Sequence, residues 1–233
     1  MKINNLSFAF SSKSSPFFQH IDMTLEPNKI YFLQGANGSG KSTLFRLLQG
    51  NVRSGEIIGG TVSVDNKIYD LRDNATRDML HTFVHAVHQD YDTMLADQFN
   101  FEENIRFAHM PRYPSLKPLS RHQLIPAFIE RFKIDLSKPV YLLSGGQRQI
   151  LAMLTALQKS TALLLLDEPT AALDPVNTQT VLAFLHELVA QTAITILIIS
   201  HDQTVMKEYA QPENSFEMYI DTKTGIRTLE RKR

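Results

Sequence analysis

Hydrophobic spacing in the first fifty residues predicts two strands, a buried strand and a helix. Residues 3–10 are rich in β-forming side chains and residues 20–25 alternate between apolar and polar, so both are expected to be strands. The apolar run 29–34 predicts a short buried strand, and helical spacing over 42–49 ends at Gly50. We therefore expect an antiparallel start, followed by strand, loop and helix.

Short runs of β-forming residues recur in the rest of the chain. They cover residues 61–64, 67–69, 82–88, 216–220 and 226–229. The first two runs flank the turn-forming pair Asp65-Asn66, and the last two flank a polar turn at 222–225. Each pair is therefore expected to form a hairpin, and residues 82–88 a separate strand.

Two fully apolar runs in the C-terminal half predict parallel strands. Residues 162–167 and 193–200 lack the alternation of a half-exposed strand, which is typical of strands buried on both faces. Between them, an apolar stripe with helical spacing follows Asp174-Pro175, a favourable N-cap and first helical residue. Strand, helix and strand in this order favour an α/β fold with a mixed core sheet.

The middle of the chain has a different texture, with short helical stretches separated by prolines. Helices are expected over 101–109 and 124–132. We expect residues 90–159 to form a helical subdomain inserted into a core of 1–89 and 160–233. The length of 233 residues suits a single domain of this kind, because domains average about 100–200 residues.

Composition excludes several classes of function. Hydrophobic residues make up 43% of the chain and charged residues 21%, as in ordinary globular proteins. The 24 basic and 24 acidic residues cancel, so no global field favours nucleic acid or an anionic membrane surface. Cysteine is absent, which excludes disulfides and thiolate chemistry. We expect no signal peptide and no apolar run of the ~20 residues that span a bilayer.

A glycine-rich loop between the strand 29–34 and the helix 42–49 predicts a phosphate-binding site. It fits the pattern G-x-x-x-x-G-K-[ST], and the residues expected to hold a nucleotide are Gly35, Asn37, Gly38, Ser39, Gly40, Lys41, Ser42 and Thr43. Backbone amides of such a loop wrap phosphate oxygens, and the helix N-terminus adds positive potential. Lys41 is expected to reach the β and γ phosphates, and Ser42 to bind Mg²⁺.

Two carboxylates at the end of an apolar strand form a second candidate site. Asp167 and Glu168 follow the run 163–166, and α/β sheets bind ligands at the carboxyl ends of their strands. Adjacent side chains on a strand point in opposite directions, so the two groups are expected to differ in role. Asp167 suits Mg²⁺ binding, and Glu168 suits the polarisation of an attacking water.

The motif LSGGQ is a third candidate site, because it precedes an apolar helix. Serine followed by two glycines makes a helix N-terminus that a phosphate can approach closely. The residues expected to form this second anion site are Ser144, Gly145, Gly146 and Gln147.

Four motifs together resemble the nucleotide-binding subunit of ATP-binding cassette (ABC) transporters: GANGSGKS, LSGGQ, LLLLDEPTAALD and ISHD. The resemblance covers nearly the whole chain. It implies a P-loop NTPase with an N-terminal antiparallel β subdomain and a helical signature subdomain, which binds ATP and Mg²⁺. It also implies a head-to-tail homodimer that sandwiches two ATP molecules, each between the phosphate loop of one copy and LSGGQ of the other.

The resemblance implies roles for four further residues. Gln89 matches the glutamine that contacts Mg²⁺ and the attacking water, and Asp174, in AALD, matches the aspartate of the family's D-loop. His201 matches the histidine that contacts the γ-phosphate. Phe10 lies where the family has an aromatic residue that stacks on adenine, with packing in the core as the alternative. The expected catalytic residues are therefore Lys41, Glu168 and His201.

Two departures from the family pattern concern contacts around the site. Ala171 stands where many members have serine, so one hydroxyl contact across the dimer is expected to be missing. The sequence ILAMLTAL after Gln149 lacks an arginine that is common in the family, which affects a contact in the helical subdomain. Neither change removes a member of the catalytic set.

The predicted function is an ATPase subunit that powers solute transport through a separate permease, at the cytoplasmic face of the membrane. Residues 91–103 lie where the family receives the permease, so Phe99 and Phe101 are candidate contacts, with core packing as the alternative. The texture of QFNFEEN and LLSGGQRQ leans to an importer-like subunit, for which an external solute-binding protein is a further candidate partner.

Two alternatives to transport explain the sequence less well. A soluble ABC-type ATPase that acts on DNA or ribosomes fits less well, because the chain has one cassette, no heptad run and no net positive charge. No nucleic-acid partner is therefore expected. A phosphate-loop kinase or GTPase would leave LSGGQ unexplained.

Overall fold

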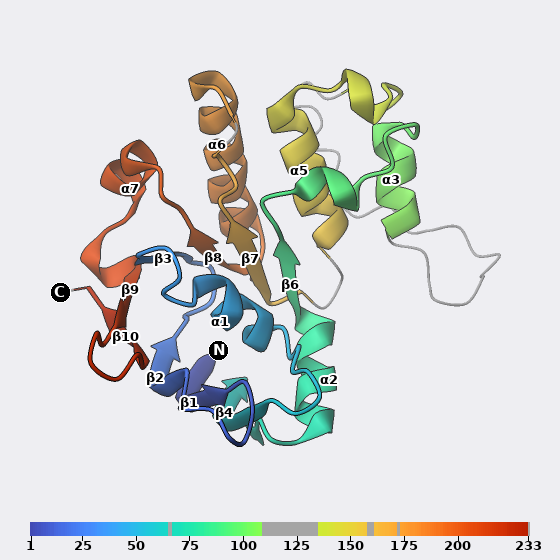
Figure 1. Ribbon diagram of the computed structural model, residues 1–233. Helices are drawn as coiled ribbons and strands as arrows, with labels where there is room; N and C mark the ends of the chain where they lie inside the picture. Colours follow the sequence, from blue (N-terminus) through green and yellow to red (C-terminus); the bar gives the residue numbers. More distant parts are fainter. Residues whose placement is uncertain (65–66, 109–134, 158–160, 172, 233) are drawn as a thin grey trace.

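The computed structural model describes residues 1–64, 67–108, 135–157, 161–171 and 173–232 (Figure 1). The strands are β1 (Lys2–Ala9), β2 (Phe18–Thr24), β3 (Ile30–Gly35), β4 (Ile57–Val64), β5 (Lys67–Asp70), β6 (Val84–Val87), β7 (Leu163–Asp167), β8 (Thr195–Ile199), β9 (Ser215–Ile220) and β10 (Arg227–Arg231). The helices are α1 (Lys41–Leu48), α2 (Asn74–Phe83), α3 (Phe101–Ala108), α5 (Gly145–Ala156), α6 (Pro175–Gln191) and α7 (Gln203–Tyr209). Single 3-10 turns lie at η1 (Tyr91–Met94), η2 (Val140–Leu142) and η3 (Pro212–Asn214).

These strands form one mixed sheet in the order β5-β4-β1-β2-β10-β9-β3-β8-β7-β6. Its first four strands pair antiparallel, as the alternating pattern near the N-terminus predicted. Strands β3, β8, β7 and β6 pair parallel, and the C-terminal hairpin β9–β10 joins the two regions. The predicted α/β fold with a mixed sheet is confirmed.

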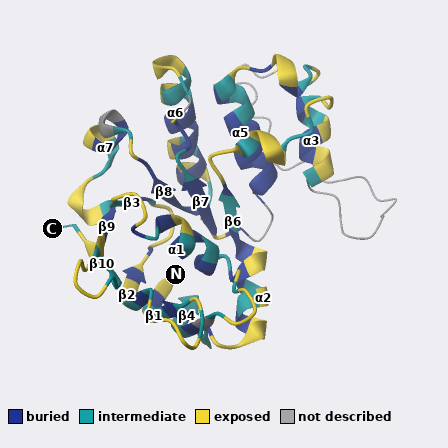
Figure 2. Ribbon diagram, viewed as in Figure 1, coloured by how far each residue is buried: buried dark blue, intermediate teal, exposed yellow. Residues whose placement is uncertain are grey.

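The parallel strands are buried on both faces, which explains their unbroken apolar sequences. Leu164 on β7 and Ile198 on β8 pack in the same cluster as the buried faces of α5 and α6. Leu165 and Leu197, one residue away, pack instead with α1 and the antiparallel strands, because side chains on a strand alternate between faces. Figure 2 shows this buried layer at the centre of the molecule, with the exposed residues on the outer turns.

The helices α3 and α5 lie together beyond the β6 edge of the sheet, and α5 also packs along α6 (Figure 1). The structure confirms a helix at the predicted 101–109, whereas the predicted helix 124–132 lies outside the described residues. Phe101 is fully buried, so the core alternative is correct for this residue, while Phe99 is 43% exposed. The limits 90–159 of the helical subdomain stay a prediction.

The expected strand at 82–88 is partly wrong, because a helix occupies its beginning. Helix α2 runs to Phe83, and β6 comprises only Val84–Val87. The buried residues of α2 are Thr76, Leu80 and Phe83, whose spacing matches a helical face that the β-rich texture of 82–88 obscured. Helix α7 was not predicted either.

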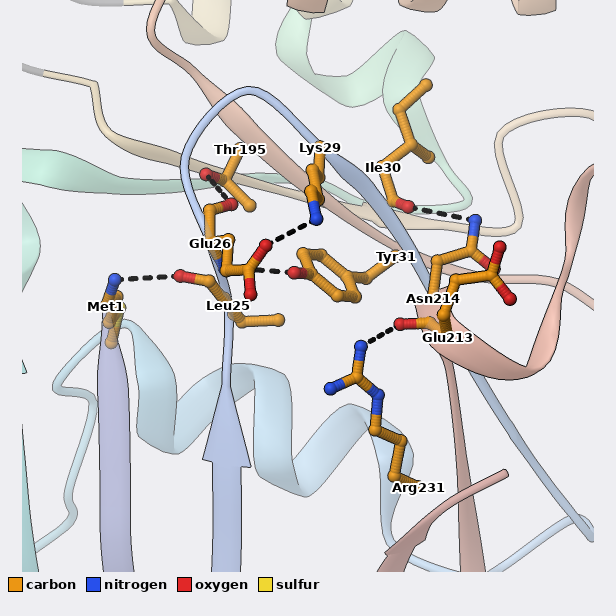
Figure 3. A network of polar contacts seen from close by, with 10 residues as sticks. All are labelled: Met1, Leu25, Glu26, Lys29, Ile30, Tyr31, Thr195, Glu213, Asn214 and Arg231. Atoms are coloured by element: carbon orange, nitrogen blue, oxygen red, sulfur yellow. Dashed lines mark hydrogen bonds and ion pairs between the residues drawn. The ribbon is translucent and has the colours of Figure 1, made fainter. Parts of the chain in front are cut away.

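The turn that leads into β3 is tied to the rest of the molecule by a polar network (Figure 3). The Glu26 backbone N–H donates to the Tyr31 hydroxyl at 3.0 Å, and the Thr195 hydroxyl donates to the Glu26 carbonyl at 3.1 Å. From η3, the Asn214 side chain donates to the Ile30 carbonyl at 3.2 Å. These bonds hold the start of the strand that carries the phosphate loop at its other end.

Within the described residues, none of the helices combines the length and the apolar character that crossing a bilayer requires.

Candidate nucleotide-binding site

The glycine-rich loop joins the end of β3 to the start of α1, as the sequence predicted. Gly38 and Gly40 have φ values of 77° and 102°, in the left-handed region that favours glycine. A Cβ atom at Gly40 would also lie 2.9 Å from the rings of Phe17 and Phe18. Backbone conformation and close packing therefore both require glycine at this position.

The loop is closed around the side chain of Lys41, which is only 7% exposed. Its ammonium donates to the Gly35 carbonyl at 2.8 Å and to the Ala36 carbonyl at 3.2 Å. Burial lowers the pKa of Lys41, while the carboxylates of Asp167 and Glu168 oppose this shift. Both of these acceptors are neutral carbonyl oxygens. A charged phosphate oxygen would be a stronger acceptor for the ammonium than either of them.

Ser39 provides an independent sign that the loop is made for a ligand. Its hydroxyl is fully buried and has no hydrogen-bond partner among the described residues. Leaving a buried polar group unpaired costs about 1–3 kcal/mol. Such a group at the turn of a phosphate loop is expected to be satisfied when the nucleotide is bound.

Ser42 and Asp167 bring two oxygen ligands together from α1 and the end of β7. The Ser42 hydroxyl lies 3.5 Å from a carboxylate oxygen of Asp167. Adjacent ligands of an octahedral Mg²⁺ are about 2.9 Å apart, since each lies 2.0–2.1 Å from the ion. The pair therefore fits Mg²⁺ after a small adjustment. Burial and the neighbouring Glu168 raise the pKa of Asp167.

Gln89 lies just after the carboxyl end of β6, the strand next to β7 in the sheet. Strand β6 pairs with β7 in a register that matches Val87 with Leu166. Gln89 follows the end of β6 by two residues, as Glu168 follows the end of β7 by one, and the Gln89 side chain is exposed. The arrangement allows Gln89 to face a ligand held by Ser42 and Asp167.

Glu168 faces His201 across the ends of β7 and β8. A carboxylate oxygen of Glu168 lies 3.7 Å from the His201 Nε2. Glu168 has a φ of 50°, and its backbone N–H donates to the Ile199 carbonyl at 2.8 Å. Positive φ is uncommon outside glycine and is typical of functional sites, where surrounding structure holds the strained residue. The two predicted catalytic groups are therefore brought together by neighbouring strand ends.

Phe10 is 48% exposed, so the alternative that it packs in the core is wrong. Its ring packs edge-to-face on Phe8 at 5.1 Å and on Phe17 at 4.9 Å between centroids. Phe17 also contacts Gly40, which connects this aromatic group to the phosphate loop. Phe17 was not among the predicted site residues, although the adjacent Phe17 and Phe18 at the start of β2 are a visible signal.

We expect Phe10→Ala to weaken ATP binding by about 1–3 kcal/mol, the range for a base that loses its aromatic stacking partner. Phe10→Tyr should bind ATP almost as well as the wild type, because the ring is kept. Titration with a fluorescent ATP analogue measures both. Phe107→Ala is the matched control, since Phe107 is 65% exposed on α3. Equal affinities for Phe10→Ala and Phe107→Ala would show that Phe10 does not stack on the base.

The motif LSGGQ forms the start of α5, with Ser144 as its N-cap. The Gln147 backbone N–H donates to the Ser144 hydroxyl at 3.2 Å, and the Ser144 backbone N–H donates to the Gln147 side chain at 3.1 Å. Gly145 and Gly146 occupy the first turn of the helix without side chains. The Ser144 hydroxyl also donates to the Asn177 side chain at 3.2 Å, so both of its hydrogen-bond partners lie outside the phosphate loop.

Asp174 caps α6 beside this motif. One of its carboxylate oxygens accepts from the backbone N–H groups of Val176 and Asn177, both at 2.9 Å. The bonds from Asn177 contribute most to lowering the pKa of Asp174. The carboxylate is exposed, so it is available to a second molecule.

Two contacts that the sequence did not predict connect the segment after Gln89 to LSGGQ. The Tyr91 hydroxyl lies 3.5 Å from the Gly145 carbonyl, and the Arg148 side chain lies 3.6 Å from an Asp92 carboxylate oxygen. Both pairs are more than fifty residues apart in the sequence. These contacts connect the start of α5 directly to the segment that follows Gln89.

The fold and the site define an α/β ATPase with a phosphate loop. Residues 18–171 match the ABC transporter family model. The lipoprotein-releasing system ATP-binding protein LolD of Treponema denticola is 31% identical over 93% of this chain and 94% of its own length. The chain belongs to the ABC transporter family, and it is an ATP-binding and ATP-hydrolysing subunit of a transport system.

Other relatives and solved structures agree with this assignment. The methionine import ATP-binding protein MetN of Streptococcus agalactiae is 30% identical over 90% of this chain, which spans 59% of that relative. CbiO1 of Clostridium perfringens, part of the transporter complex CbiONQ, has a TM-score of 0.76 at 27% identity, covering 93% of this chain and 83% of that one. A dimeric ATP-binding cassette with ADP and Pi has a TM-score of 0.67, covers 100% and 97% of the two chains, and at 20% identity shows the fold alone.

Proposed function

We propose that two copies of this chain bind two ATP molecules with Mg²⁺ and transmit closure of the pair to a membrane-embedded permease. The observation that carries the proposal is that three groups lie at the carboxyl ends of the parallel strands. They are the buried Lys41, the Ser42–Asp167 pair at 3.5 Å and the Glu168–His201 pair at 3.7 Å. A site with a cation, a metal-ligand pair and a base suits phosphoryl transfer to water.

Each group has a distinct role in this proposal. Lys41 binds the β and γ phosphates and offsets their charge, and the loop amides orient them. Ser42, Asp167 and Gln89 would hold Mg²⁺, which would neutralise charge on the same phosphates. Glu168 orients and polarises the attacking water, and His201 contacts the γ-phosphate opposite it.

The second copy completes each site. Ser144, Gly145, Gly146 and Gln147 form the N-terminal start of α5, and in this proposal they bind the γ-phosphate held by the other copy. Asp174 is linked to Ser144 through the side chain of Asn177. This arrangement makes ATP part of the dimer interface.

The permease is the proposed partner on the membrane side, with the chain at the cytoplasmic face, where ATP is available. The named relatives serve systems for lipoprotein release and for methionine import, so they support a permease partner without selecting one direction of transport. An external solute-binding protein would accompany the permease of an importer. Family membership also favours transport over action on DNA or ribosomes.

Fractionation of cells that express the tagged chain tests this proposal. We expect the chain to co-purify with an integral membrane protein after detergent extraction, and Lys41→Ala to co-purify equally because docking does not use the phosphate loop. Retention on DNA or ribosomes that is lost on raising the salt concentration, with no integral partner, would contradict it.

A further inference from the structure

Asn177, in the first turn of α6, connects the two helix starts that face the second copy in the proposed dimer. Its side-chain Nδ2 donates to an Asp174 carboxylate oxygen at 2.5 Å. Its Oδ1 accepts from the Ser144 hydroxyl at 3.2 Å. One amide therefore joins the cap of α6 to the cap of α5, which are 33 residues apart in the sequence.

The two helix starts are also packed closely at this point. A Cβ atom at Gly146 would lie 2.6 Å from the Asn177 Oδ1 and 3.0 Å from its Cβ. A Cβ atom at Gly145 would lie 3.0 Å from a methyl group of Leu173. The glycines of LSGGQ thus leave room for the Asn177 amide to reach Ser144.

The donor in the hydrogen bond between Ser144 and Asn177 follows from the other bonds of the two side chains. A serine hydroxyl has one proton to donate, and the Ser144 hydroxyl already accepts from the Gln147 backbone N–H. Its proton is donated to Asn177, and Asp174 fixes the amide orientation that presents Oδ1 rather than Nδ2. The rotamer of the hydroxyl is therefore set before any phosphate arrives.

We propose that Asn177 is a positioning residue, which holds the Ser144 hydroxyl in place for the phosphate of the partner's nucleotide. This inference rests on the proposed sandwich dimer. When phosphate binds, it replaces the Asn177 Oδ1 as the acceptor of the Ser144 proton. The Ser144 side chain is already ordered, so binding does not have to order it. Asn177 touches no nucleotide in this scheme and acts only through Ser144.

Asn177→Ala separates this role from a role in stability. The Asp174 oxygen that caps α6 accepts from backbone N–H groups, including that of residue 177, which the substitution keeps. The helix start should therefore persist, and the melting temperature should change little. Gln179→Ala is the matched control, because the Gln179 amide lies on the α7 side of the same helix, 3.4 Å from the Tyr209 hydroxyl.

The experiment uses Glu168→Gln as the background, in which ATP is retained. Two quantities are measured: ATP affinity of the monomer by fluorescence titration, and ATP-dependent dimerisation by analytical ultracentrifugation. We expect Asn177→Ala to keep the monomer affinity within about twofold and to weaken dimerisation about three- to tenfold, the cost of ordering one side chain on binding. Gln179→Ala should change neither.

A double-mutant cycle with Ser144→Ala decides whether Asn177 acts through the hydroxyl. In the Ser144→Ala background, Asn177→Ala should cause no further loss of dimerisation. An equal loss in both backgrounds, or unchanged dimerisation in the single variant, would overturn the role of Asn177. If Glu168→Gln itself stays monomeric with ATP, the proposed dimer is wrong and the inference falls with it.

Discussion

Lys41→Ala is expected to abolish measurable ATP hydrolysis and to weaken ATP binding strongly. The lysine lies inside the phosphate loop, 7% exposed, with its ammonium held at 2.8 Å from the Gly35 carbonyl. It is the fixed cation that the loop aims at the transferring phosphoryl group. Removing one such group typically lowers kcat by about 10²–10³. A phosphate-release assay at saturating ATP, with a fluorescence titration for affinity, measures both effects.

The control for this variant is Lys67→Ala, because Lys67 is exposed on the edge strand β5. Thermal melting of both variants would separate loss of the site from loss of the fold. The alanine leaves the Gly35 and Ala36 carbonyls without the ammonium, but it also removes a buried charge, so the change in stability should be modest. Near wild-type turnover in Lys41→Ala would rule out the assigned role of the phosphate loop.

The parallel core of the fold was predictable because its signals are local. The apolar runs that became β7 and β8 are buried on both faces, and the Asp174-Pro175 pair does start α6. The boundary between α2 and β6 was not predictable from the same rules. There the β-forming residues Thr82 and Phe83 complete a helix, because Phe83 continues the buried face of Thr76 and Leu80.

The site shows the same division between local and distant information. The phosphate loop, the carboxylate pair and the helix start at Ser144 follow from short motifs, and the structure places them on the predicted elements. Packing between distant segments is different. The contacts of Asn177 with Ser144, Phe17 with Gly40, and Tyr91 with Gly145 depend on how the sheet and helices assemble. The spacing of residues in the sequence does not predict these three contacts.

The geometry of α5 also changes how LSGGQ is understood. Its glycines have neighbours within their own chain, since side chains there would contact Asn177 and Leu173. The close approach of a phosphate and the packing of two helix starts therefore select the same residues. A substitution at Gly146 would test both together, whereas substitutions at Ser144 and Glu168 separate nucleotide binding from hydrolysis.

Glu168→Gln is expected to convert the isolated chain from a monomer into an ATP-dependent dimer. Glutamine keeps the size of the side chain, but it cannot accept the proton of the attacking water. ATP should therefore persist in the site, with turnover lowered by at least 10²-fold, the lower end of general-base contributions. Since the nucleotide joins the phosphate loop of one copy to Ser144 of the other, its persistence should hold the two copies together.

Ser144→Arg added to Glu168→Gln provides the decisive comparison. The long side chain at the N-cap of α5 would occupy the space that the partner's phosphate needs, while the phosphate loop of the same chain is left unchanged. The double variant should bind ATP as a monomer and fail to dimerise. Size-exclusion chromatography with light scattering, with and without ATP, measures the outcome. If Glu168→Gln stays monomeric at saturating ATP, or the added Ser144→Arg leaves the dimer intact, the two copies do not share their nucleotides.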